Sequence, residues 1–390
     1  MSEFKSSNFR NEDGSGGPDI VGLTTFTSPY YFVPPSGTTA ERPSNPAPGM
    51  LRFNEDIGRL EVWRNDHWAT ILGESPNLGN QLVTNSAGGT GPRGLLAGGY
   101  SPAPGTLVDR IDYITISTLG NAQDFSNLVA ATRLAGGCAS STRGLFGGGA
   151  SPAPTKTTKI DYVTISSTGN AQDFGDLTLE RNQLGACSNQ TRGIWGGGDG
   201  PGVAPSIVNV IDYVTIASTG NAVDFGNLIA NVEQLSACSS SVRGVFGAGT
   251  VPSFSDVIQY ITISTTGDAQ DFGDLATARN NAGCCSNPIR GVWSGGAQSP
   301  GAADLTSIEF ITIASTGNAQ DFGDLTTATR ALSACSSSIR GIFNGGQSGA
   351  SPLDTIEYIT IPTTGNAQDF GDLQAPTTQN FSCSNGHGGL

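Results

Sequence analysis

The sequence predicts an all-β protein, most of which forms a six-bladed β-propeller. Two observations support this prediction. A segment of about 50 residues recurs six times, and each copy contains four short stretches with the alternation of β-strands. Four strands per repeat, in roughly four to eight repeats, is typical of propeller blades. The composition agrees, because 55 Gly, 21 Pro and only 13% charged residues are unlike a helical or coiled-coil protein.

The repeat is marked by three features that return at nearly constant spacing. An Arg-Gly pair before an apolar segment and two small residues, mostly glycines, begins at Arg93, Arg143, Arg192, Arg243, Arg290 and Arg340. An Asp-Phe pair begins at Asp124, Asp173, Asp224, Asp271, Asp321 and Asp369. A cysteine recurs at Cys138, Cys187, Cys238, Cys285, Cys335 and Cys383. Successive arginines are 50, 49, 51, 47 and 50 residues apart, and we expect them to bind carbonyl groups at strand ends.

Each copy is predicted to hold four strands, which the last copy illustrates. The expected strands cover 331–337, 340–344, 355–361 and 367–373, with a Gly-Asn turn before the fourth. The first copy enters on its second strand at position 93, and the segment 380–384 matches a first strand. We expect this C-terminal segment to complete the first blade and remove its open edge. The alternative donor is the segment 81–86.

Only one interval of the repeat changes in length. It runs from the closing glycine to the third strand and spans 13, 12, 14, 10, 13 and 11 residues, whereas the other intervals are constant. Loops that are free to vary on a rigid scaffold often bind ligands, although solvated connectors without a function are the alternative. The candidate receptor-binding or ligand-binding residues in these loops are Tyr100, Lys156, Lys159, Asp199, Phe254, Gln298, Asp304 and Gln347.

Residues 1–77 lack the repeat and are predicted to form two parts. Residues 1–49 form an extended, Pro- and Gly-rich arm without a core of its own, and residues 50–77 form a small β-unit with strands at 51–54, 59–63 and 68–72. The propeller then occupies 78–390. We expect the first two parts to anchor the chain to a partner, the alternative being an arm packed on its own propeller. Candidate anchoring residues are the aromatics Phe26, Tyr30, Tyr31, Phe32, Trp63 and Trp68.

Charge and hydropathy exclude several classes of partner. The chain has 19 Lys and Arg against 33 Asp and Glu, a net charge of −14, which disfavours a phosphate backbone as ligand. No apolar run approaches the roughly 20 residues of a spanning helix, so we expect no membrane insertion. No secretory signal is evident at the N-terminus, so synthesis and folding in a cytoplasm are expected.

The reactive side chains do not form a catalytic pattern. The recurring cysteines are one blade apart, farther than the roughly 5.5 Å between Cα atoms that a disulfide needs, so they are predicted to be free and buried. The two histidines, His67 and His387, lie outside the blade repeats. We therefore expect no enzyme activity, no cofactor and no metal site, with calcium binding at the Asp-Phe turns left open.

Two family resemblances add to this interpretation. The order of Arg-Gly-apolar-aromatic-x-Gly-Gly, a third strand containing Tyr, and a fourth strand containing an aromatic residue resembles a kelch repeat, with Phe in place of the usual Trp. This similarity covers the chain from position 93 onward. The segment from Glu41-Arg42-Pro43 through Pro48-Gly49-Met50-Leu51-Arg52-Phe53-Asn54 to Gly58-Arg59-Leu60-Glu61-Val62-Trp63 resembles a module of structural proteins of tailed phages, notably phages of cyanobacteria.

The second resemblance implies a function. A chain of this kind is expected to be a virion structural protein, a fibre or appendage tip that other virion proteins hold through residues 1–77. The propeller would be displayed for binding to the host surface, for which a glycan is one receptor, and a homotrimer is one option for its assembly. The alternative is a capsid decoration or neck protein that contacts only its virion neighbours.

Overall fold

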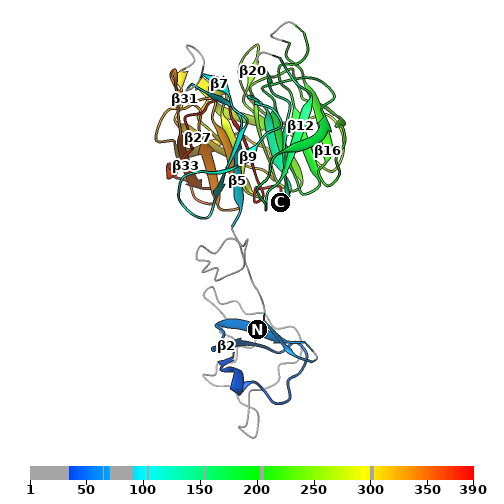
Figure 1. Cartoon of the computed structure of the whole chain (residues 1–390), viewed down its shortest axis with the longest axis vertical. Helices are drawn as coiled ribbons and strands as arrows, with labels where there is room; N and C mark the ends of the chain where they lie inside the picture. The colour runs from blue at the N-terminus through cyan, green and yellow to red at the C-terminus, as the bar shows by residue number, and fades with distance from the viewer. Residues whose placement is uncertain are drawn as a thin grey trace, which may run out of the picture. The chain divides into compact units, whose positions relative to one another are not determined.

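The computed structural model describes residues 35–64, 66–70, 91–102, 105–152, 155–202, 206–298 and 303–390. These residues form an all-β structure, in which the only helical segment is the 3-10 turn η1 (Thr39–Glu41). The chain divides into two compact units, Met1–Ser75 and Pro76–Leu390. Figure 1 shows the strands of each unit.

The N-terminal unit contains one sheet of four strands in chain order. They are β1 (Ser36–Gly37), β2 (Leu51–Asn54), β3 (Arg59–Trp63) and β4 (Trp68–Thr70). The predicted strands at 51–54 and 59–63 are confirmed, and the third is described as far as Thr70. β1 pairs with β2 in parallel. Ser36 and Gly37, which lie in the predicted arm of residues 1–49, thus pair with the first strand of the predicted β-unit.

Polar side chains are the most buried groups of this small sheet. The carboxylate of Glu61 is fully buried and accepts hydrogen bonds from Arg42 at 2.6 Å and Arg52 at 2.9 Å. Asn54 also donates to it, at 3.2 Å. The hydrogen bonds with Arg42 lower the pKa of Glu61 despite its burial. Leu60 projects to the other face of β3 and stays half-buried, so alternation alone did not identify the buried face.

The described residues of the second unit contain six larger antiparallel sheets, which we number 1 to 6, and two small sheets of two strands each. Five of the six have four strands, and sheet 4 has four corresponding strands that three short loop strands extend to seven. Sheet 1 is β35 (Phe381–Ser384), β5 (Arg93–Ala97), β8 (Arg110–Thr115) and β9 (Gln123–Asn127). Sheet 2 is β10 (Gly136–Ala139), β11 (Arg143–Gly147), β12 (Lys159–Thr164) and β13 (Gln172–Asp176). Sheet 3 is β14 (Gly185–Ser188), β15 (Arg192–Gly196), β16 (Val210–Thr215) and β17 (Val223–Asn227).

The remaining three sheets follow the same order. Sheet 4 is β18 (Ser236–Ser239), β19 (Arg243–Gly247), β21 (Ser253–Thr262) and β22 (Gln270–Asn280). Sheet 5 is β23 (Gly283–Ser286), β24 (Arg290–Ser294), β27 (Ser307–Thr312) and β28 (Gln320–Asp324). Sheet 6 is β29 (Ser333–Ser336), β30 (Arg340–Asn344), β33 (Thr355–Thr360) and β34 (Gln368–Asp372). The four predicted strands of the last copy thus correspond to sheet 6, with ends that differ by one or two residues.

Sheet 1 combines the two ends of the repeat array. β35 pairs antiparallel with β5, and the register places Cys383 opposite Leu95. The prediction that the C-terminal segment supplies the first strand is confirmed, and the alternative donor at 81–86 lies outside the described residues. First strands of neighbouring sheets contact one another in the order β35, β10, β14, β18, β23, β29, and β29 contacts β35 again.

The repeated arginines connect each sheet to the next. Each NH1 group donates to the carbonyl of an isoleucine that follows the third strand of the next sheet, at 2.8 to 3.0 Å. The pairs are Arg93–Ile165, Arg143–Ile216, Arg192–Ile263, Arg243–Ile313, Arg290–Ile361 and Arg340–Ile116. The last pair joins sheet 6 to sheet 1. The expectation that these arginines bind strand-end carbonyls is confirmed.

A close fit between glycine and cysteine explains why both residues recur. In sheet 2, a β-carbon added to Gly144 would lie 2.9 Å from the sulfur of Cys383 in sheet 1. The same contact recurs for every sheet, at 2.7 to 2.9 Å: Gly94–Cys335, Gly193–Cys138, Gly244–Cys187, Gly291–Cys238 and Gly341–Cys285. The cysteines are free, as predicted, and burial raises the pKa of Cys138 to about 12. They therefore act as small apolar packing groups.

Candidate functional site

The loops of variable length lie at one end of the six-sheet unit. Several form small hairpins: β6 (Tyr100–Ser101) with β7 (Thr106–Leu107), β20 (Thr250–Val251) with β21, β25 (Ala297–Gln298) with β26 (Ala303–Asp304), and β31 (Gln347–Ser348) with β32 (Ser351–Pro352). Figure 1 shows β7, β20 and β31 at the same end of this unit, away from the C-terminus. We call this end the loop face.

The base of each loop is attached to the connection that leads into a first strand. Single β-bridges join Tyr100 to Thr378, Arg133 to Ala150, Asn182 to Asp199, Glu233 to Thr250 and Arg330 to Gln347. In sheet 5, the extended strand β22 pairs with β25 to the same effect. The loops are therefore held by backbone hydrogen bonds, which fits a rigid binding surface.

A ring of six residues surrounds the axis at the loop face. Leu134, Gln183, Gln234, Asn281, Ala331 and Gln379 all have a positive φ, between 52° and 59°. The amide of each donates to the carbonyl of the next around the ring, at 2.8 to 3.1 Å, and the sixth bond returns to the first residue. These residues line a pocket of about 130 Å³, which we call the axial mouth.

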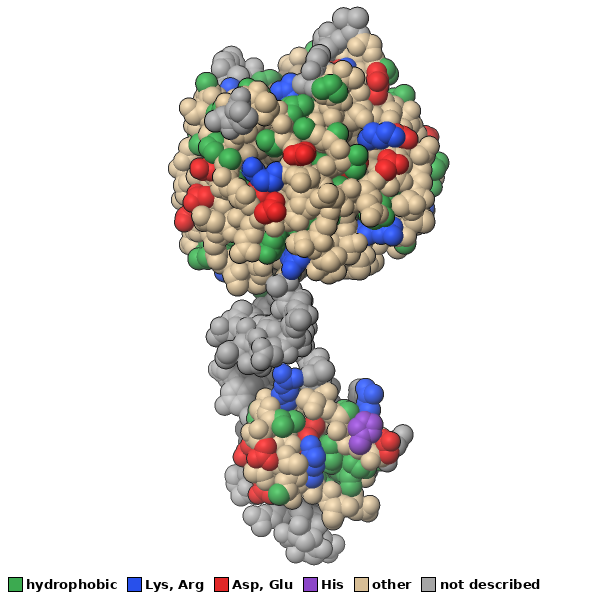
Figure 2. Space-filling view, viewed as in Figure 1, with side chains coloured by type: hydrophobic (Ala, Val, Ile, Leu, Met, Phe, Trp, Pro, Cys, Tyr) green, Lys and Arg blue, Asp and Glu red, His purple; other side chains and the backbone are tan. Residues whose placement is uncertain are grey.

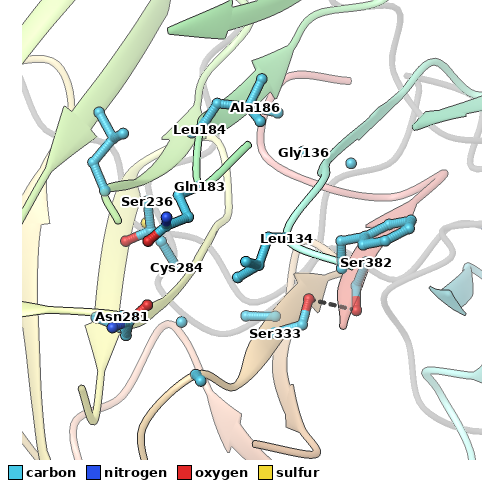
Figure 3. Close-up of a pocket in the computed structure, with 18 of the residues that line it drawn as sticks. Leu134, Gly136, Gln183, Leu184, Ala186, Ser236, Asn281, Cys284, Ser333 and Ser382 are labelled. Atoms are coloured by element: carbon cyan, nitrogen blue, oxygen red, sulfur yellow. Dashed lines mark hydrogen bonds between the residues drawn. The ribbon is translucent and has the colours of Figure 1, made fainter. Parts of the chain in front are cut away.

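Four of the six ring residues at the axial mouth carry carboxamides, Gln183, Gln234, Asn281 and Gln379, whereas most of the other lining residues are Gly, Ala, Leu or Ser. Figure 3 shows Gln183, Asn281 and Leu134 among the lining side chains, together with the hydrogen bond between Ser333 and Ser382. The Oε1 atom of Gln379 accepts a hydrogen bond from Arg133 at 3.0 Å, which fixes the orientation of that amide. Carboxamides both donate and accept hydrogen bonds, so the mouth suits an uncharged, oxygen-rich ligand.

A larger cleft lies between the loops of sheets 1 and 2. It has a volume of about 580 Å³ and is lined by Tyr100, Gly105, Thr106, Leu107, Ala131, Arg133, Ser151 and Pro152. This volume is within the range of about 300 to 1,000 Å³ typical of small-molecule sites. An aromatic ring beside aliphatic carbons and one guanidinium suits the apolar face and the hydroxyl groups of a sugar.

Two of the predicted binding residues bind each other. Lys156, from the loop of sheet 2, forms an ion pair with Asp199 of sheet 3 at 2.8 Å and donates to the carbonyl of Gly200. Asp199 also accepts from the backbone amide of Ser206 at 2.9 Å. Their side chains are 11% and 8% exposed, so they connect two loops and offer little free surface. Burial and the nearby Asp199 raise the pKa of Glu233 beside them.

A second connection involves two further predicted residues. Asp304 pairs with Arg330 at 3.4 Å and accepts from the amide of Gly349 at 2.6 Å. Gln347 donates to the carbonyl of Gly349 at 3.1 Å and accepts from Thr378 at 3.2 Å. The loops of sheets 5 and 6 are therefore joined to each other and to the connection before β35.

The remaining predicted loop residues are separated from one another. Tyr100 is half-buried at the 580 Å³ cleft, whereas Phe254 and Gln298 are half-buried in the hairpins of sheets 4 and 5. Lys159 belongs to β12, where it is exposed and pairs with Asp176 at 3.1 Å, which raises its pKa. The structure thus places all eight residues on or beside the loop face without gathering them into one pocket.

The residues of the axial mouth were not predicted from the sequence. They occupy the position four residues before each recurring cysteine, where the side chain changes among Leu, Gln, Asn and Ala while the strand that follows is regular. That local variation is a detectable signal, although it changes no spacing within the repeat.

Buried charged residues lie beneath the loop face. Arg181 and Asp212 are both fully buried and form an ion pair at 2.9 Å, and Arg279 pairs with Glu309 at the equivalent place. Asp161 occupies the position of Asp212 in sheet 2, and the pKa of this carboxyl rises to about 6 because it is buried. These residues connect neighbouring sheets, since Arg181 also donates to the carbonyls of Gly197 and Val210.

Neither unit contains a candidate metal site among its described residues, where no group of three or more His, Cys, Asp or Glu side chains could hold an ion. The acidic residues of the Asp-Phe pairs are exposed. Figure 2 shows acidic and basic side chains interspersed on the visible face of the six-sheet unit. No helix of the described residues is long and apolar enough to cross a membrane.

The predicted anchoring residues are only partly described. Trp63 and Trp68 lie opposite each other on β3 and β4, with ring centroids 5.6 Å apart, and both are half-buried. The guanidinium of Arg52 lies 6.0 Å from the Trp68 ring. Phe26, Tyr30, Tyr31 and Phe32 lie outside the described residues.

Comparisons with known proteins do not identify the chain. No model of a known protein family matches it, and no curated protein matches it.

Proposed function

We propose that residues 91–390 form a six-bladed β-propeller similar to kelch propellers, with sheets 1 to 6 as the blades. The contacts between first strands, which return from β29 to β35, support this proposal. So do the six Arg–Ile hydrogen bonds that lead from each sheet to the next. In a propeller, β35 would be the strand that joins the last blade to the first.

We further propose that the protein is a structural protein of a tailed-phage virion, a fibre or appendage tip. The N-terminal region would attach it to other virion proteins, and the loop face would bind a glycan of the host surface. The single observation that carries the binding proposal is the arrangement of six variable loops around a mouth whose ring of six residues includes four carboxamides. Host attachment also agrees with the division into two compact units, one for each task.

Adsorption of particles to host cells tests this proposal. The variants Asn281→Ala and Tyr100→Ala change the axial mouth and the cleft. Alanine is tolerated at the first site, because Ala331 occupies the equivalent position with a φ of 54°. Both variants should assemble into particles and adsorb to host cells more slowly. The control is Val223→Ala, an exposed side chain at the start of the outer strand β17, away from the loop face.

A specific observation favours the alternative of a decoration or neck protein. Large apolar side chains are exposed at the end opposite the loop face: Leu119, Val242 and Ile289 are 58%, 59% and 62% exposed. Contact with virion neighbours at this end would cover these side chains. If the loop-face variants adsorb normally while Val242→Ser and Ile289→Ser prevent incorporation into particles, this alternative replaces host attachment.

A further inference from the structure

The end of the axial channel opposite the loop face is lined by a series of serines. Their hydroxyl groups each donate to the carbonyl of the preceding first strand, at 2.6 to 2.8 Å. The donors and acceptors are Ser188 to Ala139, Ser239 to Ser188, Ser286 to Ser239, Ser336 to Ser286 and Ser384 to Ser336. The sixth position is Ala139, which has no hydroxyl group. The series is therefore interrupted at sheet 2.

The residues that follow β35 lie at the position where Ala139 leaves the series of serine hydroxyl groups incomplete. His387 lies beside Ala139, with Nε2 at 2.9 Å from the carbonyl oxygen and 3.2 Å from the hydroxyl of Ser188. The amide of Gly388 donates to the carbonyl of Ser286 at 3.0 Å. The tail therefore extends from sheet 1 and binds sheets 2, 3 and 5, across a channel whose remaining volume is about 50 Å³.

The glycines of the tail are required by its surroundings. A β-carbon on Gly388 would collide with the carbonyl oxygens of Ser239 and Asn287, and one on Gly389 would collide with that of Ser188. The segment Gly-His-Gly-Gly thus combines backbone without side chains with a single imidazole. This is the composition that a narrow polar channel can hold.

The partners of His387 require a neutral imidazole. Its Nε2 faces a carbonyl oxygen, which only accepts, so Nε2 carries the proton and donates. Its Nδ1 accepts from the amide of Gly389 at 3.0 Å and must keep its lone pair. A second proton, on Nδ1, would face an N–H group and break this turn of the tail.

From this geometry, we propose that residues 386–390 are an internal plug of the axial channel, which fastens sheets 1, 2, 3 and 5 together and is released when His387 is protonated. The occupant of the channel end is thus a segment of the chain itself. This inference does not depend on the proposed role in host attachment.

The electrostatic surroundings agree with release in acid. The channel end is lined by Gly, Ala, Ser and Cys residues besides His387, so its other titratable groups are thiols, such as Cys138, Cys187 and Cys383. Burial of the imidazole lowers the pKa of His387, an effect that its bond to Ala139 only partly offsets. The stability from a neutral His387 is therefore complete above its usual pKa of about 6.5 and is lost as pH falls toward the lowered value.

Hydrogen exchange of the full chain at pH 7.5 and pH 5.0, corrected for the intrinsic rate, tests the plug. In the native chain, the equilibrium constant for opening of residues 386–390 should increase by up to about tenfold for each pH unit below about 6.5, until the lowered pKa of His387 is reached. The variant His387→Asn should open equally at both pH values. The control His67→Asn, which removes the exposed histidine of the other unit, should behave as the native chain does.

Deletion of residues 386–390 provides a second measurement, because it leaves β35 in place. The deletion should lower the melting temperature at pH 7.5 by more than at pH 5.0. Two results would overturn the proposal: tail protection in the native chain that is equal at both pH values, or a deletion variant that melts as the full chain does at pH 7.5.

Discussion

Replacing Asp212 by Asn tests whether the buried charges hold neighbouring sheets together. The carboxylate is fully buried, bonds to Arg181 at 2.9 Å, and accepts from the backbone amide of Thr178 at 3.1 Å. Asparagine has nearly the same shape and keeps an acceptor for that amide, so the main change is an unpaired guanidinium. Removing one partner of a buried ion pair typically costs about 3 to 5 kcal/mol.

The chain contains a natural example of the same position without charges. In sheet 4, Gln259 replaces the carboxylate and accepts from the amide of Ile229 at 2.8 Å, while Val232 replaces the arginine. In five of the six sheets this position accepts a backbone hydrogen bond, the exception being Asp112, which pairs with Arg110. The buried cation is therefore optional. The double variant Arg181→Met with Asp212→Asn should accordingly recover about 2 kcal/mol or more of the loss.

Urea unfolding of the native chain, the single variants Asp212→Asn and Arg181→Met, and the double variant measures these values, with the buried Trp195 and Trp293 as fluorescence probes of the six-sheet unit. The reasoning is refuted if Asp212→Asn costs less than about 1 kcal/mol, the value of an ordinary neutral hydrogen bond. It is also refuted if the decrease in the free energy of unfolding of the double variant equals the sum of the decreases of the two single variants.

Three further predictions concern the contacts between sheets. Gly144→Ala should destabilise the protein by about 1 to 3 kcal/mol in thermal unfolding, because its β-carbon meets a buried sulfur, whereas Gly169→Ala, with no atom within 4 Å, should not. Truncation after Gln379 should lower the melting temperature of the whole unit and raise its tendency to aggregate, because β5 becomes an open edge; an unchanged melting curve would contradict this. The raised pKa of Asp161, about 6, should make the free energy of unfolding of the native chain fall as pH rises from about 4 to 6. Thr132→Arg should supply the cation that Asp161 lacks and lower this pKa, so this fall should disappear from urea titrations.

Local patterns explain how much of the fold could be predicted. The strands of sheet 6 follow from alternation and from turn residues within one copy of the repeat, and the pairing of β35 follows from counting which copy lacks a strand. The packing role of the recurring cysteines could also be predicted, because the glycine and the cysteine that contact each other, such as Gly144 and Cys383, return in every copy of the repeat.

Contacts between distant loops explain most of what could not be predicted. Lys156 and Asp199 were expected to face a ligand, but they are neighbours only because adjacent sheets bring their loops together. The environment of Glu61 was missed because a buried carboxylate depends on two arginines at unrelated positions. The tail at His387 was missed because it lies outside the repeat, so no equivalent residue indicated its place.

We propose that the N-terminal region attaches the protein to a virion while the loop face binds the host. A cryo-EM map of the intact particle, alone and adsorbed to host cells, would show both contacts. We expect residues 35–70 to contact other virion proteins and Tyr100 and Asn281 to face outward, with host density over them after adsorption. A map in which the loop face is covered by other virion proteins would contradict host attachment, and one that lacks the protein would contradict a role in the virion.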